Sequence, residues 1–323
     1  MKRRFSFKAL LKSVAMHPAM RLYRVNLFRF RLRRDWSAVV KISEKLESQP
    51  LRLERRLVFP EGKSTRTLFI LGSGASVNRL SRIQFQEIQR HCSVGINVWA
   101  AHRFVPDCYS FESGGFPRTD DEFEHRAYLS RCLTRPEVIE SRPSFVVLRP
   151  ASPSSRDQLI EIPESLADRE FFYGRANLPQ SNTKVIKDDL RALTASFLSQ
   201  KTSIGALPDN GASVIRMIFL GLKLNFSKIV LLGVDLSDSP YFWYEKPYVD
   251  SRPEMVTLFP RPLAAPHDTL DDSKRPFNTR NLIVELAKVF RSEHQCEILS
   301  GLSHSGWDTD LATFDWGRDL HSA

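Results

Sequence analysis

A turn made of small residues is the feature of this sequence best suited to bind a phosphate. Within TLFILGSGASVNRL, a strand-like run passes into a helix-like one through Gly72, Ser73, Gly74 and Ser76. Glycine permits a sharp turn and lets backbone N–H groups approach a ligand closely. Val77 stands where a dinucleotide-binding turn has its third glycine, and no Gly-Lys-Ser/Thr of a Walker loop follows. The turn therefore fits either a mononucleotide site or an ordinary strand–helix connection.

Polar residues also follow two other apolar runs. Asn97 lies at the end of the run SVGINV, and Asp235 closes KIVLLGVD. Asn210 and Gly211 open a helical pattern, and a helix N-terminus favours an anion. Open α/β sheets bind ligands at the carboxyl ends of their strands, so these residues are candidate ligand contacts. Asn97 and Asp235 are also suited to closing turns.

The elements that would position these residues alternate along the chain. Short apolar runs predict strands buried on both faces, at 67–72, 93–98, 107–112, 144–148, 228–233 and 295–299. Apolar stripes predict helices at 188–197, 211–223 and 278–291. We therefore predict an α/β fold, a single Rossmann-like, mostly parallel sheet with helices on both faces. Two Pro-rich stretches, 149–187 and 236–277, are expected to be insertions over the carboxyl edge of the sheet, the second a lid.

In their order and spacing, these motifs resemble those of the family 42 bacterial sialyltransferases and the related domain of unknown function 115 proteins. The turn at 72–76 matches the family's Gly-x-Gly-x-Ser, Asn97 the asparagine after its second strand, and 233–235 its Gly-Ile-Asp strand end. The pair at 210–211 matches its Ser/Thr-Gly helix start loosely. The resemblance covers roughly residues 66–300. It implies a GT-A-like sheet that binds a CMP-activated sugar without a metal.

The resemblance also implies roles for single residues. The glycine turn and Asn97 would contact cytidine monophosphate, and the lid tyrosines Tyr241 and Tyr244 would hydrogen-bond the departing phosphate. A lid histidine, which maps to His267, would take the proton of the acceptor hydroxyl. Histidine titrates near neutral pH and tyrosine is a neutral donor, so both suit this chemistry. The family's first lid tyrosine is missing, with Ser237 about there, and the spacing to His267 is longer than in the family.

Further polar residues leave alternatives open. Ser303 follows the last predicted strand and would either line the ligand site or belong to a plain polar loop. The aspartates of DLSD and DTD have spacings that resemble the DxD of metal-dependent glycosyltransferases, but such spacings arise often by chance. We expect no metal and no cofactor besides the donor sugar nucleotide.

The net positive charge of the chain comes from its N-terminal segment, which we define as residues 1–50. The net charge is +10, yet residues 2–34 hold eleven Lys and Arg and no acid, while the rest carries 36 basic and 37 acidic residues. Cations interleaved with Phe, Leu and Tyr are typical of an interfacial helix on an anionic membrane, or of a helix packed on the body with a solvated basic face. The near-neutral body, 60–316, argues against wide contact with nucleic acid. The absence of an apolar run of about 18 residues predicts no transmembrane helix.

Together these features predict a metal-independent, inverting glycosyltransferase that moves a CMP-activated nonulosonic acid to a cell-surface saccharide or glycolipid. The donor sugar would be sialic acid or a relative such as Kdo. We expect a bacterial enzyme of lipopolysaccharide or capsule biosynthesis, cytoplasmic and peripheral to the inner membrane, with a homo-oligomer left open. The rivals are an enzyme of the same scaffold with another nucleotide-bound donor, and a non-catalytic, membrane-tethered scaffold protein. The four cysteines lack CxxC spacing and predict buried thiols in a reducing compartment.

Overall fold

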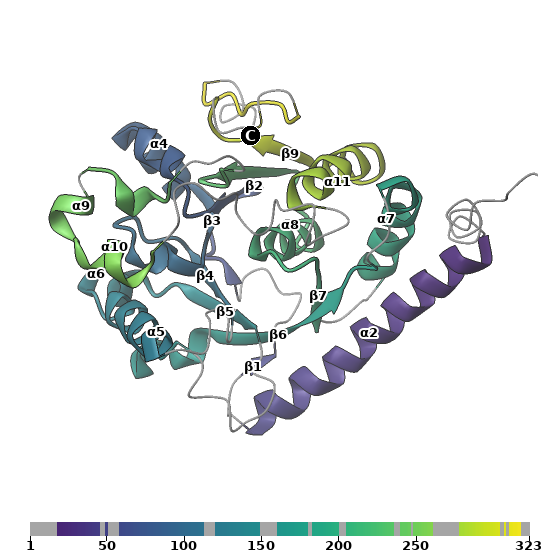
Figure 1. Ribbon diagram of the computed structural model, residues 1–323, viewed down its shortest axis with the longest axis horizontal. Coiled ribbons are helices and arrows are strands. Elements are labelled where there is room, and N and C mark those ends of the chain that lie inside the picture. The colour runs from purple at the N-terminus through teal and green to yellow at the C-terminus, as the bar shows by residue number, and fades with distance from the viewer. Residues whose placement is uncertain are drawn as a thin grey trace, which may run out of the picture.

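The computed structural model describes residues 18–45, 49–50, 58–112, 120–148, 160–179, 183–199, 205–235, 240–246, 248–260, 278–303, 307 and 310–317. In this part of the chain nine strands form one sheet: β1 (Gln49–Pro50), β2 (Ser64–Leu71), β3 (His91–Ile96), β4 (Cys108–Phe111), β5 (Ser144–Leu148), β6 (Glu170–Asn177), β7 (Ala206–Asp209), β8 (Lys228–Leu232) and β9 (Glu297–Ser300). Their order is β1-β6-β5-β4-β3-β2-β8-β9, and β7 pairs with the second half of β6 (Figure 1). Each of these pairings is parallel, so the predicted α/β fold with a single parallel sheet is confirmed.

Helices cover both faces of the sheet (Figure 1). One face carries α2 (Pro18–Lys45), α7 (Thr183–Leu198), α8 (Ser213–Lys223) and α11 (Thr279–His294). The other face carries α4 (Arg82–Gln89), α5 (Asp120–Leu133), α6 (Pro136–Ser141), α9 (Tyr248–Ser251) and α10 (Glu254–Leu258). Two cores therefore form, one on each side of the sheet.

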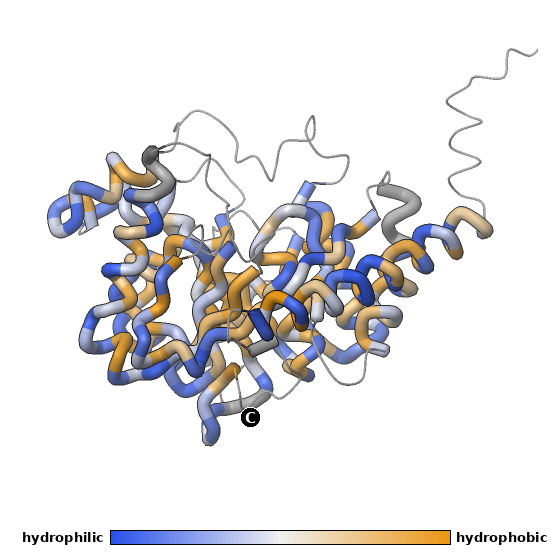
Figure 2. The backbone as a smooth tube through the Cα atoms, turned by 90° about the horizontal axis from the view of Figure 1, so that it is seen from below, coloured by the Kyte–Doolittle hydropathy of each residue, from blue (hydrophilic) through white to orange (hydrophobic). Residues whose placement is uncertain are grey.

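The central strand β2 contributes to both cores. Leu68 and Ile70 pack on the side of α8, while Phe69 and Leu71 pack on the opposite side. All four side chains are fully buried, which is why the strand reads as a continuous apolar run rather than an alternating one. Figure 2 shows hydrophobic segments gathered in this interior. All four cysteines are buried and free, as predicted.

The order of the strands places a topological switch point between β2 and β8. From β2 the chain adds β3, β4, β5 and β6 in one direction, and then returns to add β8 and β9 on the other side of β2. Ligands of open parallel sheets bind outside the carboxyl ends of the strands at such a point. The glycine turn follows β2 directly, so the fold places it at this point.

The six predicted strands are all present, with bounds that differ by no more than three residues, and the three predicted helices are α7, α8 and α11. The prediction of an insertion over 149–187 is wrong for residues 170–177, which form β6, and for 183–187, which begin α7. This strand pairs with β5 and β1 through its first half and with β7 through its second half. Its first residues are buried aromatics, whereas Arg175 and Asn177 are exposed, and this mixture hid the strand within a polar stretch.

The described part of the N-terminal segment consists of the helix α2, packed on the body, and the two-residue strand β1. Val25, Phe28 and Leu32 belong to the same core as α7 and α8. Beneath the helix the chain needs a small residue, because a Cβ atom on Gly205 would lie 2.2 Å from the ring of Trp36. None of the described helices combines the length and hydropathy of a membrane-spanning segment.

Candidate active site

The glycine turn lies against the turn that follows β8. The Gly72 N–H donates to the Leu232 carbonyl at 2.7 Å, and the Gly74 N–H donates to the Gly233 carbonyl at 2.7 Å. A Cβ atom on Gly72 would lie 2.4 Å from the carbonyl oxygen of Gly233, a distance that real Cβ atoms do not adopt. In this structure the glycines therefore serve the close packing of two backbone segments.

The carboxylate of Asp235 lies at the start of the short helix η1 (Ala75–Arg79). Its Oδ2 accepts from the Ser76 N–H at 2.8 Å, and its Oδ1 accepts from the Ser76 Oγ–H at 2.5 Å. The Ala75 N–H donates to the Pro240 carbonyl at 3.0 Å. Asp235 thus occupies the position where the sequence predicts the ligand phosphate. Phosphate binding at this turn stays a prediction, and it requires Asp235 to move.

The described part of the predicted lid, 240–246 and 248–260, is folded onto the body as η5 (Phe242–Tyr244), α9 and α10. Its backbone pairs with the glycine turn, because Tyr241 forms an antiparallel bridge with Gly74. The Phe242 N–H donates to the Ser73 carbonyl at 2.9 Å. The glycine turn and the start of the lid therefore form one structural unit.

The two lid tyrosines lie in different surroundings. The ring of Tyr241 is half-buried and stacks on Trp243 with the centroids 4.4 Å apart. The Tyr244 hydroxyl donates to the Phe259 carbonyl at 3.2 Å, within the lid. His267 lies outside the described residues. The structure thus places Tyr241, but not the Tyr244 hydroxyl, beside the glycine turn.

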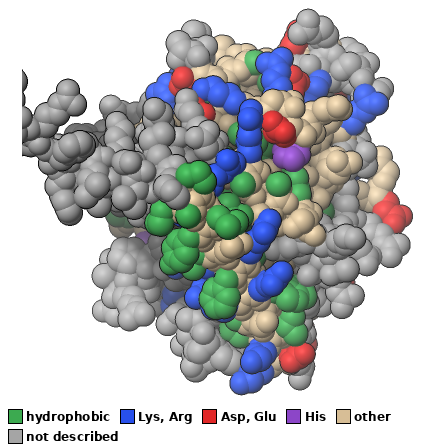
Figure 3. Space-filling view, turned by 90° about the vertical axis from the view of Figure 1, so that its right-hand side faces the viewer, with side chains coloured by type: hydrophobic (Ala, Val, Ile, Leu, Met, Phe, Trp, Pro, Cys, Tyr) green, Lys and Arg blue, Asp and Glu red, His purple; other side chains and the backbone are tan. Residues whose placement is uncertain are grey.

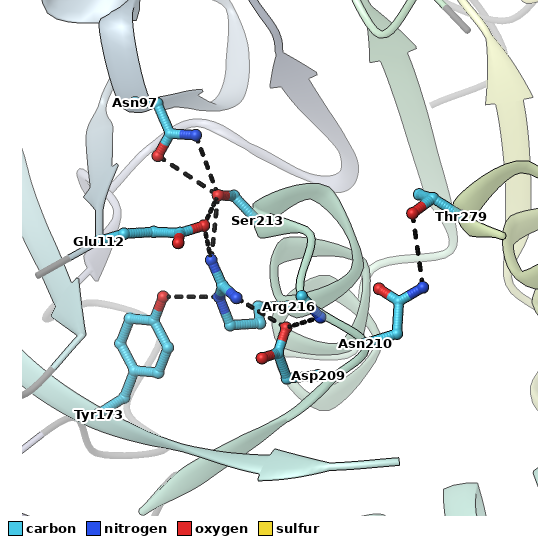
Figure 4. A network of polar contacts seen from close by, with 9 residues as sticks. Asn97, Glu112, Tyr173, Asp209, Asn210, Ser213, Arg216 and Thr279 are labelled. Carbon is cyan, nitrogen blue, oxygen red and sulfur yellow. Dashed lines mark hydrogen bonds and ion pairs between the residues drawn. The ribbon is translucent and has the colours of Figure 1, made fainter. Parts of the chain in front are cut away.

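A second group of polar side chains lies at the carboxyl ends of β3, β4 and β7, together with Tyr173 from the middle of β6 (Figure 4). Asn97 follows β3 with a φ of 53°, a left-handed conformation that asparagine adopts more readily than most residues. Its Nδ2 donates to the Ser213 Oγ at 3.1 Å, although the two residues are 116 positions apart. Ser213 begins α8, whose N-cap residue, Ala212, provides no side-chain cap. Two motifs that the sequence places far apart therefore meet at the first turn of this helix.

Arg216, in the first turn of α8, is fully buried and holds this network together. Its Nη1 donates to Asp209 at 2.7 Å, its Nε to the Tyr173 hydroxyl at 3.1 Å, and its Nη2 to both Ser213, at 3.0 Å, and Glu112. Burial alone would lower the pKa of this guanidinium, but Tyr173, Glu112 and Asp209 raise it above its ordinary value. A buried ion pair adds little to stability compared with apolar packing, but losing one partner leaves the other charge buried and uncompensated.

Glu112 lies at the edge of the network, where its side chain is 25% exposed, and Asn97 is also half-buried. The Glu112 Oε1 accepts from the Ser213 hydroxyl and from the Arg216 guanidinium. Its Oε2 has no hydrogen-bond partner among the residues that the structure describes, and no dashed line reaches it in Figure 4. A carboxylate oxygen held in this way accepts hydrogen bonds from the hydroxyl groups of a ligand.

The predicted residues of the helix start lie beside this network. The Gly211 N–H donates to Asp209 at 2.8 Å, and Gly211 has a φ of 89°, which favours glycine. Asn210 instead faces α11, where its Nδ2 donates to the Thr279 Oγ1 at 3.5 Å. Ser303 is exposed in the loop after β9 and makes no contact with the network in the described part of the chain.

Sequence reasoning missed Glu112 and Arg216. Glu112 follows an apolar strand in the same way as Asn97 does, so the same argument would have found it. Arg216 is a charged residue near the start of an otherwise apolar helix, a pattern that indicates a buried ion pair. No group of three or more His, Cys, Asp and Glu side chains is arranged to hold a metal within the described ranges.

The fold and the site define an open parallel α/β protein with polar side chains gathered at the carboxyl edge of its sheet. No protein-family model matches the sequence, and no curated protein matches it significantly. Among solved structures, the chain is similar to the monofunctional α-2,3-sialyltransferase Cst-I from Campylobacter jejuni, with a TM-score of 0.40 and 14% identity over 80% of this chain and 82% of that one. It is also similar to the MAf glycosyltransferase from Magnetospirillum magneticum AMB-1, with a TM-score of 0.40 and 14% identity over 85% of this chain and 38% of that one.

Proposed function

We propose that this protein is a metal-independent, inverting glycosyltransferase that moves a nonulosonic acid, sialic acid or a relative such as Kdo, from CMP to a saccharide acceptor. The observation that carries the proposal is the contact of Asn97 with Ser213 at the start of α8. Through it, polar motifs from distant parts of the sequence form one site where open α/β sheets bind their ligands. Lipopolysaccharide or capsule biosynthesis would be the setting of such a reaction.

In this proposal the nucleotide lies between α8 and the glycine turn. The first turn of α8 lacks a side-chain cap, so its N–H groups and the helix dipole favour an anion there. Asn97, Asn210 and Gly211 would hold the nucleotide from this side. The turn at 72–76 would add its N–H groups once Asp235 leaves Ser76.

The transfer breaks the bond between the anomeric carbon of the sugar and a phosphate oxygen, and the electron pair leaves with CMP. The acceptor oxygen forms the new bond on the opposite face of the sugar, while a base takes its proton. We assign His267 as this base and Tyr241 as the donor to the departing phosphate. Tyr244 would join Tyr241 only after its hydroxyl leaves the Phe259 carbonyl.

Three of the described histidines are poorly suited to act as this base. Burial, helped by nearby arginines, lowers the pKa of His102 to about 3, and its Nδ1 accepts from the Phe104 N–H at 3.0 Å. Burial also lowers the pKa of His91 and of His294. None of these three is therefore assigned as the base, and His267 keeps this role from its place in the lid sequence.

One observation favours a second candidate, a transferase of a neutral sugar carried by another nucleotide. Glu112 and Asp235 place two carboxylates at the edge of the sheet. Like charges repel, so this arrangement disfavours the carboxylate of a nonulosonic acid compared with a neutral sugar.

Thermal denaturation in the presence of CMP, UDP, GDP or ATP separates these candidates. We expect CMP to raise the melting temperature by several degrees, because a ligand that binds only the folded state stabilises it. Asn97→Gly, which keeps the left-handed backbone conformation, should abolish this rise, while Asn26→Ala on the exposed face of α2 should not. Stabilisation by UDP or GDP alone would favour the second candidate. A response to none of the four nucleotides would contradict both.

A further inference from the structure

The outward side of α2 carries an unusual combination of side chains, which we call the α2 outer face: Leu22, Tyr23, Phe30, Arg33, Arg34 and Lys41. The first three are 61%, 59% and 60% exposed, and Ile83 on α4 is the other large hydrophobic side chain with high exposure in the described part of the chain. Spacings of three and four residues place most of these positions on one side of the helix. Figure 3 shows hydrophobic side chains interspersed with Lys and Arg on this side of the molecule.

The apolar residues of this face are held outward by the packing of the helix. The opposite side of α2 buries Val25, Phe28 and Leu32 in the core. Polar contacts lock the same side, because Arg24 pairs with Asp189 and Arg29 donates to Ser196 at 3.1 Å, both on α7. Leu22, Tyr23 and Phe30 therefore stay exposed while the helix keeps these contacts.

The charged side chains of the face, Arg33, Arg34 and Lys41, are all cations, and Arg34 also pairs with Asp35 at 3.1 Å. The helix from Pro18 to Arg34 carries six arginines and no acid, although Arg24 and Arg29 contact α7. The chain beyond residue 34 is nearly neutral, so the positive charge is concentrated here. A partner that fits this face carries negative charge at its surface and apolar groups just beneath that surface. An anionic lipid bilayer has this arrangement, with charged headgroups above acyl chains.

The N-terminal half of α2 also lies next to the carboxyl end of β6. Arg31 donates to the carbonyl of Asn177, the last residue of β6, at 2.8 Å. Leu22, Tyr23 and Phe30 precede Arg31, while the later turns of α2 run back along β6 toward β1. The apolar part of the face is thus nearest the carboxyl edge of the sheet, which carries the network around Arg216.

We propose that the α2 outer face docks the folded protein on an anionic phospholipid bilayer, with α2 lying along the membrane surface and still packed on the body. Leu22, Tyr23 and Phe30 enter the boundary between headgroups and acyl chains, and the cations contact lipid phosphates. This orientation keeps the first turns of α2, next to the carboxyl end of β6, at the membrane surface. The docking rests on α2 alone, so it does not depend on the proposed transferase reaction.

The test is cosedimentation of the full chain with vesicles of phosphatidylcholine alone or of phosphatidylcholine mixed with phosphatidylglycerol. We expect binding to the mixed vesicles that weakens as ionic strength rises, and little binding to phosphatidylcholine. The triple variant Leu22→Ser, Tyr23→Ser, Phe30→Ser should reduce the affinity by about tenfold or more. Ile83→Ser, equally exposed on α4, is the matched control and should bind like the wild type. The double variant Arg33→Gln, Lys41→Gln should bind the mixed vesicles more weakly, and its binding should depend less on salt concentration.

Three outcomes would overturn the docking proposal. One is wild-type binding that is equal on both kinds of vesicle or absent from both. Another is a triple variant that melts like the wild type and binds equally well. The third is lipid-free self-association that the triple variant abolishes, because a second copy of the chain would then occupy the face. Each of these leaves the nucleotide test of the transferase reaction unaffected.

Discussion

At the end of β4, the Glu112 carboxylate binds Ser213 and Arg216 through one oxygen and leaves the other at the edge of the sheet. Arg216 uses its remaining donors on Asp209 and Tyr173, so Glu112 is held in one orientation. Burial raises the pKa of the Tyr173 phenol, which therefore stays neutral as a partner of the guanidinium. Such a fixed acceptor is suited to recognising a sugar hydroxyl.

Glu112→Gln tests this role with little change in shape. The amide oxygen still accepts from Arg216 and Ser213, but an NH₂ group replaces the acceptor Oε2. We expect kcat/KM for transfer to fall by about tenfold or more, in line with about 1.5–3 kcal/mol for a hydrogen bond to a charged group. The control is Glu140→Gln, an exposed residue on α6. If Glu112→Gln lowers the melting temperature and leaves kcat/KM unchanged, the residue is structural only.

At this scale the sequence predicted Asn97 because a polar side chain after a buried strand is a local pattern. It did not predict that Asp235 would pair with Ser76, because that contact joins residues 159 positions apart. The glycines of the turn were predicted to let backbone N–H groups approach a ligand, and that stays a prediction. The backbone that approaches Gly72 is that of Gly233, which no local pattern indicates.

At the scale of the elements, the described part of the lid packs against the body through a cluster of aromatic rings. His102 stacks on Trp99 with the centroids 4.1 Å apart, and Phe242 of η5 meets its ring edge-on at 5.2 Å. Arg252, next to α9, donates to the carbonyl of Ala101 at 2.5 Å. His102 is neutral within this packing, because burial and, after it, three nearby arginines lower its pKa.

The lowered pKa of His102 predicts a pH dependence of stability. Its pKa is about 3 in the folded state and near 6.5 when unfolded, so below about pH 6.5 the unfolded state binds a proton that the folded state does not. Stability is fully present above that pH and falls as the pH drops toward 3. Between about pH 7 and pH 5, we expect His102 to account for a loss of about 2 kcal/mol.

Urea denaturation at several pH values measures this loss. His102→Asn retains an oxygen that can accept from the Phe104 N–H, and it should unfold with a dependence on pH that is weaker by about that amount. The pKa values of His91 and His294 are also lowered, so the stability of the variant should still depend on pH with the same sign. An equal pH dependence in wild type and variant would show that His102 is not responsible.

The elements differ in how far their sequences reveal them. The strands at 67–72 and 144–148 were predictable because both of their faces are buried, which requires continuous apolar runs. β6 was not, because its burial becomes alternating where it leaves β5 to pair with β7. Likewise, α2 has apolar residues on two sides, one in the core and one on the α2 outer face, so its pattern did not distinguish packing from exposure.

At the scale of the whole molecule, two surfaces lie on the same side. The carboxyl edge of the sheet carries the Arg216 network, and the apolar part of the α2 outer face lies next to the carboxyl end of β6. A protein that docks through this face would bring its site close to acceptors held in the membrane. The two proposals support each other in this geometry, although each has its own test.

The central claim, transfer of a sugar from CMP, is tested most directly by the release of CMP. The full chain is incubated with CMP-sialic acid or with CMP-Kdo, with and without saccharide acceptors, and free CMP is measured. We predict release from at least one donor, increased by an acceptor. His267→Ala should lose this activity and still be stabilised by CMP, while His294→Ala should remain active. No CMP release from either donor by the folded protein, or full activity of His267→Ala, would contradict the account.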